Sequence, residues 1–227
     1  MLTKAAPDAG GSIAETDELY CAPGAGTSPT LGGTPRSGEP DNGGAEARQL
    51  VRRLDWRFLL PDPRLRRVAY LGPDGCLLAR ALEAFSDSLR VFAGDGPERE
   101  VTDVLVAHAA RWSDIDAAAA GLVPGGMLYW EMARGRDRLG TNPVAWLKQR
   151  GFTDIQTHWH YPGFETCRQI VPLDDAAACA SLLREHFASV DRAVLLAFSR
   201  WLTWPTLVWR LAAPTSVVAR KPRLVTP

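Results

Sequence analysis

The order of apolar and polar positions along this chain predicts strands and helices in alternation. An apolar run with strand character, residues 68–71, breaks into a Gly-Pro-Asp-Gly turn, and apolar residues at helical spacing follow over residues 76–85. Further strands are predicted at residues 89–93, 103–107, 127–132 and 153–159, and helices at residues 113–121 and 143–150. This alternation is typical of an α/β fold with a doubly wound, mostly parallel sheet.

Residues at the ends of these elements indicate where they stop. Ser113 or Asp114 is available to cap the helix at residues 113–121, and the run 122–126, LVPGG, is expected to close it. Gly151 is expected to end the helix at residues 143–150, because glycine adopts the left-handed backbone conformation of helix ends without a steric cost.

The first 46 residues differ in composition from the rest of the chain. They are rich in Gly, Pro, Ser and Thr and contain few large apolar residues, so burial would not offset the entropy of ordering them. We expect a disordered tail at residues 1–46, within which residues 12–20, SIAETDELY, are either tail or a docking peptide. Apolar residues at helical spacing over residues 47–58 then predict an amphipathic helix that begins a folded domain, residues 47–227.

An unusual stretch, THWHYPGFETCRQIVPL, follows at residues 157–173. Strand spacing places His158 and His160 on one face and Trp159 on the other, with Tyr161 next along the chain. Two histidines lack the third ligand and the supporting partners of a metal site, so no metal is expected. A substrate-binding lip or a partner surface is favoured over a metal site, and ordinary packing within a sheet is the alternative.

Residues 176–211 have two distinct patterns. Residues 176–192 form an alanine-rich helical pattern, and residues 193–211 are unusually apolar with three tryptophans. Arg200, Arg210 and Pro205 interrupt the second stretch, which argues against a membrane span. It is expected to be a buried core helix, a lid over a substrate, or an interfacial helix that meets lipid or a protein partner.

Composition and charge argue against several classes of function and of binding site. The 227 residues carry 26 Lys and Arg against 26 Asp and Glu, so overall charge gives no reason to expect nucleic acid as a partner. The four cysteines form no CxxC pair, which favours reduced thiols over a zinc site or a disulfide framework. No basic segment leads into an apolar run at the N-terminus, so we expect a cytoplasmic protein without a secretory signal.

Three stretches resemble the class I S-adenosylmethionine-dependent methyltransferase family. LVPGGMLYWE at residues 122–131 is similar to the family's signature before and within a central strand, RGFTDIQ at 150–156 to a later turn and strand, and TSVVARKP at 215–222 to its last strand. The resemblance covers roughly residues 67–159 plus the closing strand. It implies a Rossmann-like sheet, mostly parallel with a final antiparallel strand, and a helical insertion at about residues 160–214.

The resemblance also implies S-adenosylmethionine as cofactor, bound by the loop after the first strand. Tyr70 stands where the family has an acidic residue, and Gly72 and Gly75 keep part of its glycine pattern. Asp74 either holds the ligand's amino group or caps the next helix. Asp95, after the second strand, either binds both ribose hydroxyls or is a solvated turn residue.

The carboxyl ends of the next two strands supply further candidates, because ligands of open α/β sheets bind at that edge. His108 is a candidate general base, and Glu131 would lie with it where substrate meets the methyl donor. Hydrogen bonding within the sheet-end packing is the alternative for His108. Asp103, at the start of its strand, either faces the adenine or only leads the strand.

Two functions of different class follow. The first is methyl transfer to a small-molecule acceptor, with His108, Glu131, His158, His160 and Tyr161 on the acceptor side. The second is a methyltransferase-like scaffold or partner subunit of a biosynthetic enzyme that has lost the cofactor and binds its partner through the aromatic insertion.

Overall fold

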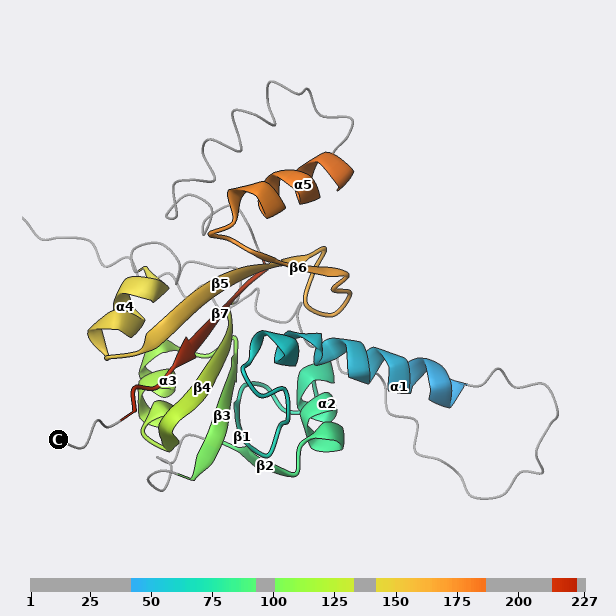
Figure 1. Ribbon diagram of the computed structural model, residues 1–227. Helices are drawn as coiled ribbons and strands as arrows, with labels where there is room; N and C mark the ends of the chain where they lie inside the picture. Colours follow the sequence, from blue (N-terminus) through green and yellow to red (C-terminus); the bar gives the residue numbers. More distant parts are fainter. Residues whose placement is uncertain (1–41, 93–100, 133–141, 187–213, 224–227) are drawn as a thin grey trace, which may run out of the picture. The chain divides into compact units, whose positions relative to one another are not determined.

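The computed structural model describes residues 42–92, 101–132, 142–186 and 214–223, all of which belong to one compact unit, Pro35–Pro227 (Figure 1). Residues 1–41 of the expected tail and the tryptophan-rich stretch at 193–211 lie outside the described residues. None of the helices in the described part combines the length and apolar character needed to cross a bilayer.

Seven strands form one sheet in the order β2-β1-β3-β4-β7-β5-β6. Their bounds are β1 Arg67–Leu71, β2 Ser88–Val91, β3 Thr102–His108, β4 Leu122–Met132, β5 Thr153–Tyr161, β6 Gln169–Pro172 and β7 Thr215–Arg220. Neighbours from β2 to β4 are parallel, whereas β7 runs antiparallel to both β4 and β5. The Rossmann-like sheet with a final antiparallel strand, expected from the methyltransferase resemblance, is therefore confirmed.

Helices lie on the two sides of this sheet (Figure 1). Their bounds are α1 Asn42–Arg53, the 3-10 helix η1 Asp55–Leu59, α2 Leu77–Phe85, α3 Trp112–Ala119, α4 Pro143–Gln149 and α5 Ala176–His186. The helix predicted at residues 47–58 is thus two elements, and it begins five residues earlier than expected. As predicted, Gly151 has a left-handed φ of 81° just after α4.

Two boundary predictions were wrong. Arg111 occupies the cap position of α3 without a side-chain bond, so Ser113 and Asp114 lie inside the helix and cap nothing. The run LVPGG at residues 122–126 does not precede a strand but belongs to β4, where Leu122 is opposite Thr102 on β3. Pairing with β3 therefore overrides the turn tendency of Pro124 and the two glycines.

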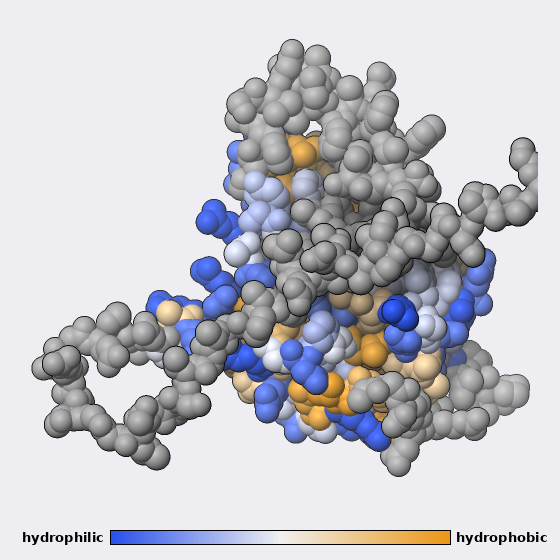
Figure 2. Space-filling model, turned by 180° about the vertical axis from the view of Figure 1, so that it is seen from behind, coloured by the Kyte–Doolittle hydropathy of each residue, from blue (hydrophilic) through white to orange (hydrophobic). Residues whose placement is uncertain are grey.

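One strand was not predicted. β6 pairs antiparallel with β5 at the outer edge of the sheet, inside the region expected to be a helical insertion. It is four residues long and ends in Pro172, a residue tolerated at a strand edge. A small cluster of Val171, Cys179, Leu182 and Leu183 joins this strand to α5. Figure 2 shows hydrophobic residues at the surface in the region of α5.

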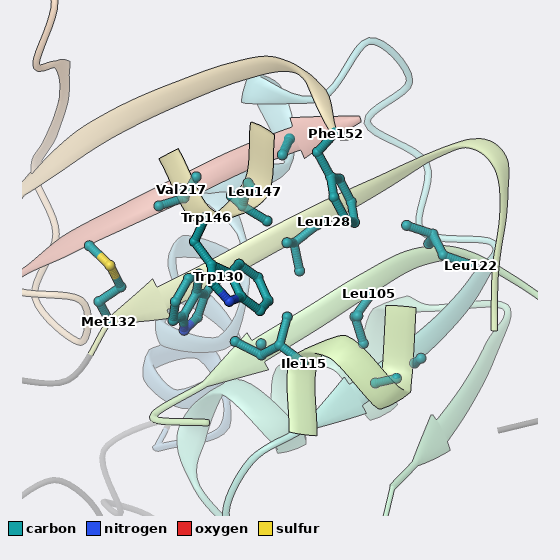
Figure 3. Close-up of a cluster of buried hydrophobic side chains, with 14 residues drawn as sticks. Leu105, Ile115, Leu122, Leu128, Trp130, Met132, Trp146, Leu147, Phe152 and Val217 are labelled. Carbon is teal, nitrogen blue, oxygen red and sulfur yellow. The ribbon is translucent and has the colours of Figure 1, made fainter. Parts of the chain in front are cut away.

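The main hydrophobic core lies between the sheet and the helices α3 and α4 (Figure 3). Residues of β4 at alternate positions, Leu128 and Trp130, point into it. Trp112 meets the rings of Trp130 and Trp146 edge to face, with centroids 4.7 and 4.9 Å apart. On the opposite side of the sheet, Tyr129 of β4 stacks on Trp56 of η1.

We predict that Gly126→Ala destabilises the protein. An added Cβ would lie 2.9 Å from the Val123 carbonyl oxygen and 3.0 Å from that of Asp103, and neither backbone atom can move without disturbing the β3–β4 pairing. Urea unfolding should show a loss of about 1–3 kcal/mol. Gly163→Ala is the matched control, because its Cβ would meet only Thr166 Oγ1, at 3.7 Å. Equal stability of the two variants would contradict the packing of Gly126.

Candidate active site

A buried histidine–glutamate pair lies at the carboxyl end of the central strands. Parallel pairing of β3 with β4 places His108 beside Glu131 in register, and His108 Nδ1 lies 2.7 Å from Glu131 Oε2. The two residues are 5% and 1% exposed. The structure thus brings together the two residues that the sequence placed at this edge.

Arg53 completes the environment of the Glu131 carboxylate. Its Nη1 and Nη2 atoms donate to the two carboxylate oxygens at 2.6 Å each, and the Tyr129 hydroxyl donates to Oε1 at 2.8 Å. Burial alone would raise the pKa of Glu131, but the charge of Arg53 and the hydrogen bonds from His108 and Arg53 hold it well below its usual range. Glu131 is therefore an ionised carboxylate inside the protein.

The ionised carboxylate decides which nitrogen of His108 carries the proton. A carboxylate only accepts hydrogen bonds, so Nδ1 of His108 must be the donor. In the neutral ring the remaining nitrogen, Nε2, then has a free lone pair and can accept a proton. Glu131 in turn contacts Arg53, Tyr129 and His108, so it orients the histidine.

The segment formed by α1 and η1 closes this site on one side. Arg53 also donates to Glu165 at 3.2 Å, and its guanidinium lies 5.7 Å from the ring centroid of Phe164. Trp56 of η1 stacks on Tyr129 with ring centroids 3.9 Å apart. The sequence analysis missed both Arg53 and Trp56. Arg53 could have been found, because it is three residues after Leu50 and so lies on the apolar stripe of α1.

Tyr70, near the end of β1, packs beneath the loop that follows this strand. The fully buried Tyr70 donates from its hydroxyl to the Pro73 carbonyl at 3.1 Å, and the same oxygen lies 3.1 Å from Cys76 Sγ. Cys76, not Asp74, is the N-cap of α2 and accepts from the Ala79 N–H. The capping interpretation of Asp74 was therefore wrong, and its side of the loop is exposed.

The two histidines of β5 share one face, as predicted, and both are buried. His160 Nε2 lies 2.7 Å from Ser216 Oγ on β7, and its Nδ1 lies 3.6 Å from Cys167 Sγ. Burial lowers the pKa of His158 to about 4 and that of His160 to about 3, so both rings are neutral at pH 7. They are packed within the sheet, whereas Tyr161 is half-buried at its edge.

Two further candidates from the sequence are Asp95 and Asp103. Asp95 falls outside the described residues. Asp103 forms a bidentate salt bridge with Arg67. It lies at the amino end of β3, whereas His108 lies at the carboxyl end of the same strand. Of the two alternatives left open for Asp103, this ion pair favours the polar residue that leads its strand. No group of three or more potential metal ligands occurs among the described residues.

Comparison with known proteins returns only distant structural similarity. No family model matches the chain, and no curated protein matches it. A Haemonchus contortus phosphoethanolamine N-methyltransferase 2 is 13% identical, with a TM-score of 0.39 over 78% of this chain and 53% of its own. An O-methyltransferase from Thermotoga maritima is 12% identical, with a TM-score of 0.39 over 72% of this chain and 62% of its own.

A third similar structure, an S-adenosylmethionine-dependent methyltransferase from Archaeoglobus fulgidus, is 12% identical, with a TM-score of 0.39 over 77% of this chain and 94% of its own. The chain thus spans about half the length of the Haemonchus enzyme and under two thirds of the Thermotoga one. At these identities and TM-scores the similarity carries no argument about this chain, so the site is judged from its own geometry.

We predict that Arg53→Met strongly destabilises the protein, because it leaves the Glu131 carboxylate buried without its cationic partner. The loss in unfolding free energy should be about 3–5 kcal/mol. The double variant Arg53→Met with Glu131→Gln removes both charges and should recover part of this loss. A matched control is Arg67→Met, which breaks an exposed pair of similar geometry and should reduce the unfolding free energy far less, because solvent already screens that pair. Equal losses for Arg53→Met and Arg67→Met would contradict the buried pair.

We also predict that stability falls as the pH is lowered through the range in which unfolded histidine is protonated. The pKa of buried His158 is about 4, below the ordinary 6.5, so between these values the unfolded state binds one proton more than the folded state. Unfolding free energy therefore rises with pH in this window, by up to about 1.4 kcal/mol per pH unit for each such histidine. Urea unfolding from pH 7 to pH 4 measures this slope. His158→Gln should reduce it, and an unchanged slope would contradict the neutral buried ring.

Proposed function

We propose that this protein transfers a methyl group from S-adenosylmethionine to a small-molecule acceptor. The observation that supports the proposal is the His108–Glu131 pair beside the loop that follows β1. A Cβ built on Gly72 of this loop would lie 3.0 Å from the His108 carbonyl oxygen, so the loop and the pair adjoin at the same edge of the sheet. A donor site and a proton acceptor would thus be neighbours.

The exposed part of the loop is suited to a bound nucleotide. Gly75 has a φ of 69°, and a Cβ added there would meet nothing within 4 Å, so the backbone is open to a ligand on that side. Asp74 and Gly75 would hold the cofactor there, together with Asp95 for its ribose hydroxyls and Gly72 at the inner end of the loop. S-adenosylmethionine, when bound, supplies an electrophilic methyl group on a sulfonium.

In this proposal, the residues of the chain remove a proton from the acceptor. An alcohol or ammonium acceptor must lose a proton before or during methyl transfer, and Nε2 of His108 would take it. Glu131 keeps the proton on Nδ1 and fixes the plane of the ring, so the lone pair points in one direction. Positioned proton transfer of this kind contributes roughly 10²–10⁴-fold to a rate. His158, His160 and Tyr161 remain candidates for the acceptor side of the site.

A second function is supported by one specific observation, the Tyr70 hydroxyl beneath the loop. Its oxygen lies within 2.5 Å of the place a Gly72 Cβ would take, so the inner end of the loop is filled by the protein itself. A methyltransferase-like scaffold that binds a protein partner, without a cofactor, would have no need of that space. The two functions differ in whether the chain binds S-adenosyl compounds at all.

Calorimetric titration of the full chain with S-adenosylhomocysteine tests the proposal. We expect saturable heat, and Asp95→Asn should weaken binding about tenfold or more, because it replaces a carboxylate that accepts charge-assisted hydrogen bonds. Asp103→Asn is the matched control and should leave the affinity unchanged, since Asp103 lies at the opposite end of the sheet. No heat and no thermal stabilisation at millimolar ligand would reject the enzyme and leave the scaffold.

A further inference from the structure

We propose that Ser216 and His160 are positioning residues for the His108–Glu131 pair, because they continue the polar contacts of Glu131 across the sheet. They act through a row of hydrogen bonds that runs in one direction and ends on the Glu131 carboxylate. The inference rests on the proposed function only where His108 is called a base. The row itself concerns the folded chain alone, and His160 needs no contact with the acceptor in this role.

Four neighbouring strands each supply a member of this row. β3, β4, β7 and β5 are consecutive in the sheet, and Glu131 of β4 is paired with His108 of β3 on one side and with Ser216 of β7 on the other. His160 of β5 reaches the same row, with its Nε2 2.7 Å from Ser216 Oγ. Together with Tyr129 of β4, these side chains are at most 5% exposed. Water has little access to them, so their polar atoms must find partners within the row.

The hydroxyl of Ser216 connects the two halves of the row. Burial raises the pKa of the Tyr129 phenol well above its usual range, and a side-chain hydrogen bond with Ser216 acts against this rise. A hydrogen bond lowers the pKa of a phenol when it is donated to the phenol oxygen, so Ser216 is the donor. The rings of Tyr129 and His160 also meet edge to face, with centroids 6.3 Å apart. Ser216 therefore contacts both Tyr129 and His160.

The ionised carboxylate sets the direction of every bond in the row. Glu131 only accepts, so the Tyr129 hydroxyl donates its one proton to Oε1, at 2.8 Å. The Tyr129 oxygen then accepts from Ser216, which leaves the Ser216 oxygen to accept from His160. Nε2 of His160 must therefore carry the proton, whereas in His108 the protonated nitrogen is Nδ1. The two histidines are thus expected to be opposite tautomers.

The thiol of Cys167 is compatible with either tautomer of His160. Its Sγ lies 3.6 Å from Nδ1 of His160 and 3.4 Å from the Gln169 carbonyl oxygen. Burial raises the pKa of Cys167 to about 11, so the thiol keeps its proton at pH 7 and donates it to one of these two acceptors. In the opposite tautomer, Nδ1 would donate to Sγ and the Ser216 hydroxyl would turn toward Nε2. The two tautomers therefore differ by the bond from Ser216 to Tyr129, which a substitution can remove.

Nitrogen-15 NMR spectra of the labelled full-length protein at pH 7 test this row, because protonated and unprotonated ring nitrogens give well separated signals. His160→Gln and His108→Gln assign the signals. We expect Nε2–H for His160 and Nδ1–H for His108. Tyr129→Phe removes the oxygen that accepts from Ser216, so the ratio of Nε2–H to Nδ1–H in His160 should fall about fivefold, the value of one net hydrogen bond.

Ser216→Ala tests the connection to His108. Without the bond from Ser216, Tyr129 is a weaker donor to Glu131, so the carboxylate accepts more strongly from His108. We expect the proton signal of His108 Nδ1–H to shift downfield.

Ser86→Ala is the matched control for Ser216→Ala. It also removes a serine hydroxyl that makes a hydrogen bond, to the Leu82 carbonyl, but that bond lies outside the row. It should leave the signals of both histidines unchanged. Circular dichroism identifies any variant that does not fold, and Tyr129→Phe still tests the row if Ser216→Ala does not fold.

Three results would each overturn the inference. They are Nδ1–H as the main tautomer of wild-type His160, an unchanged tautomer ratio in Tyr129→Phe, and a His108 signal that Ser216→Ala moves no further than Ser86→Ala does. No cofactor is present in these spectra, so any of these results leaves the proposed function to the titration with S-adenosylhomocysteine. Tautomers that respond as expected support the positioning roles even where that titration shows no binding.

Discussion

The buried ion pair between Arg53 and Glu131 is the interaction on which the rest of the structure depends. Both side chains are 1% exposed, so each charge has lost its hydration and must be compensated within the protein. Two guanidinium bonds, one histidine bond and one tyrosine bond together satisfy the carboxylate. Because Arg53 is the last residue of α1, the pair also fixes where that helix ends over the sheet.

The placement of α1 by this pair determines the surroundings of the candidate site. The chain turns directly after Arg53 into η1, whose Trp56 stacks on Tyr129 of the same strand as Glu131. The second partner of Arg53, Glu165, belongs to the connection between β5 and β6. One arginine thus holds the leading helix, a central strand and the outer part of the sheet together, and His108 receives its orientation from the same carboxylate.

The sequence was sufficient for most of the sheet, because β1, β3 and the second half of β4 contain apolar runs of strand length. It was insufficient wherever a partner distant in the chain decides the outcome. LVPGG was expected to end a helix, but pairing of Leu122 with Thr102 extends β4 through it. The shared face of His158 and His160 follows from strand spacing, whereas the contact of His160 with Ser216, 56 residues away, does not. The position of Arg53 on the apolar stripe of α1 is likewise visible in the sequence, whereas its partner Glu131, 78 residues away, is not.

The ion pair also limits what Glu131 can contribute to chemistry at His108. The Glu131 carboxylate is already balanced by Arg53, whose two terminal nitrogens donate to its two oxygens. Its remaining effect on His108 is geometric, through the hydrogen bond that holds Nδ1. A histidine held in this way has the remaining nitrogen, Nε2, fixed in one direction, which would suit it to the role of base proposed above. At this edge of the sheet the histidine ring is thus fixed by a chain of contacts that begins at the last residue of α1, so a change in α1 would reach His108 through the Arg53–Glu131 pair.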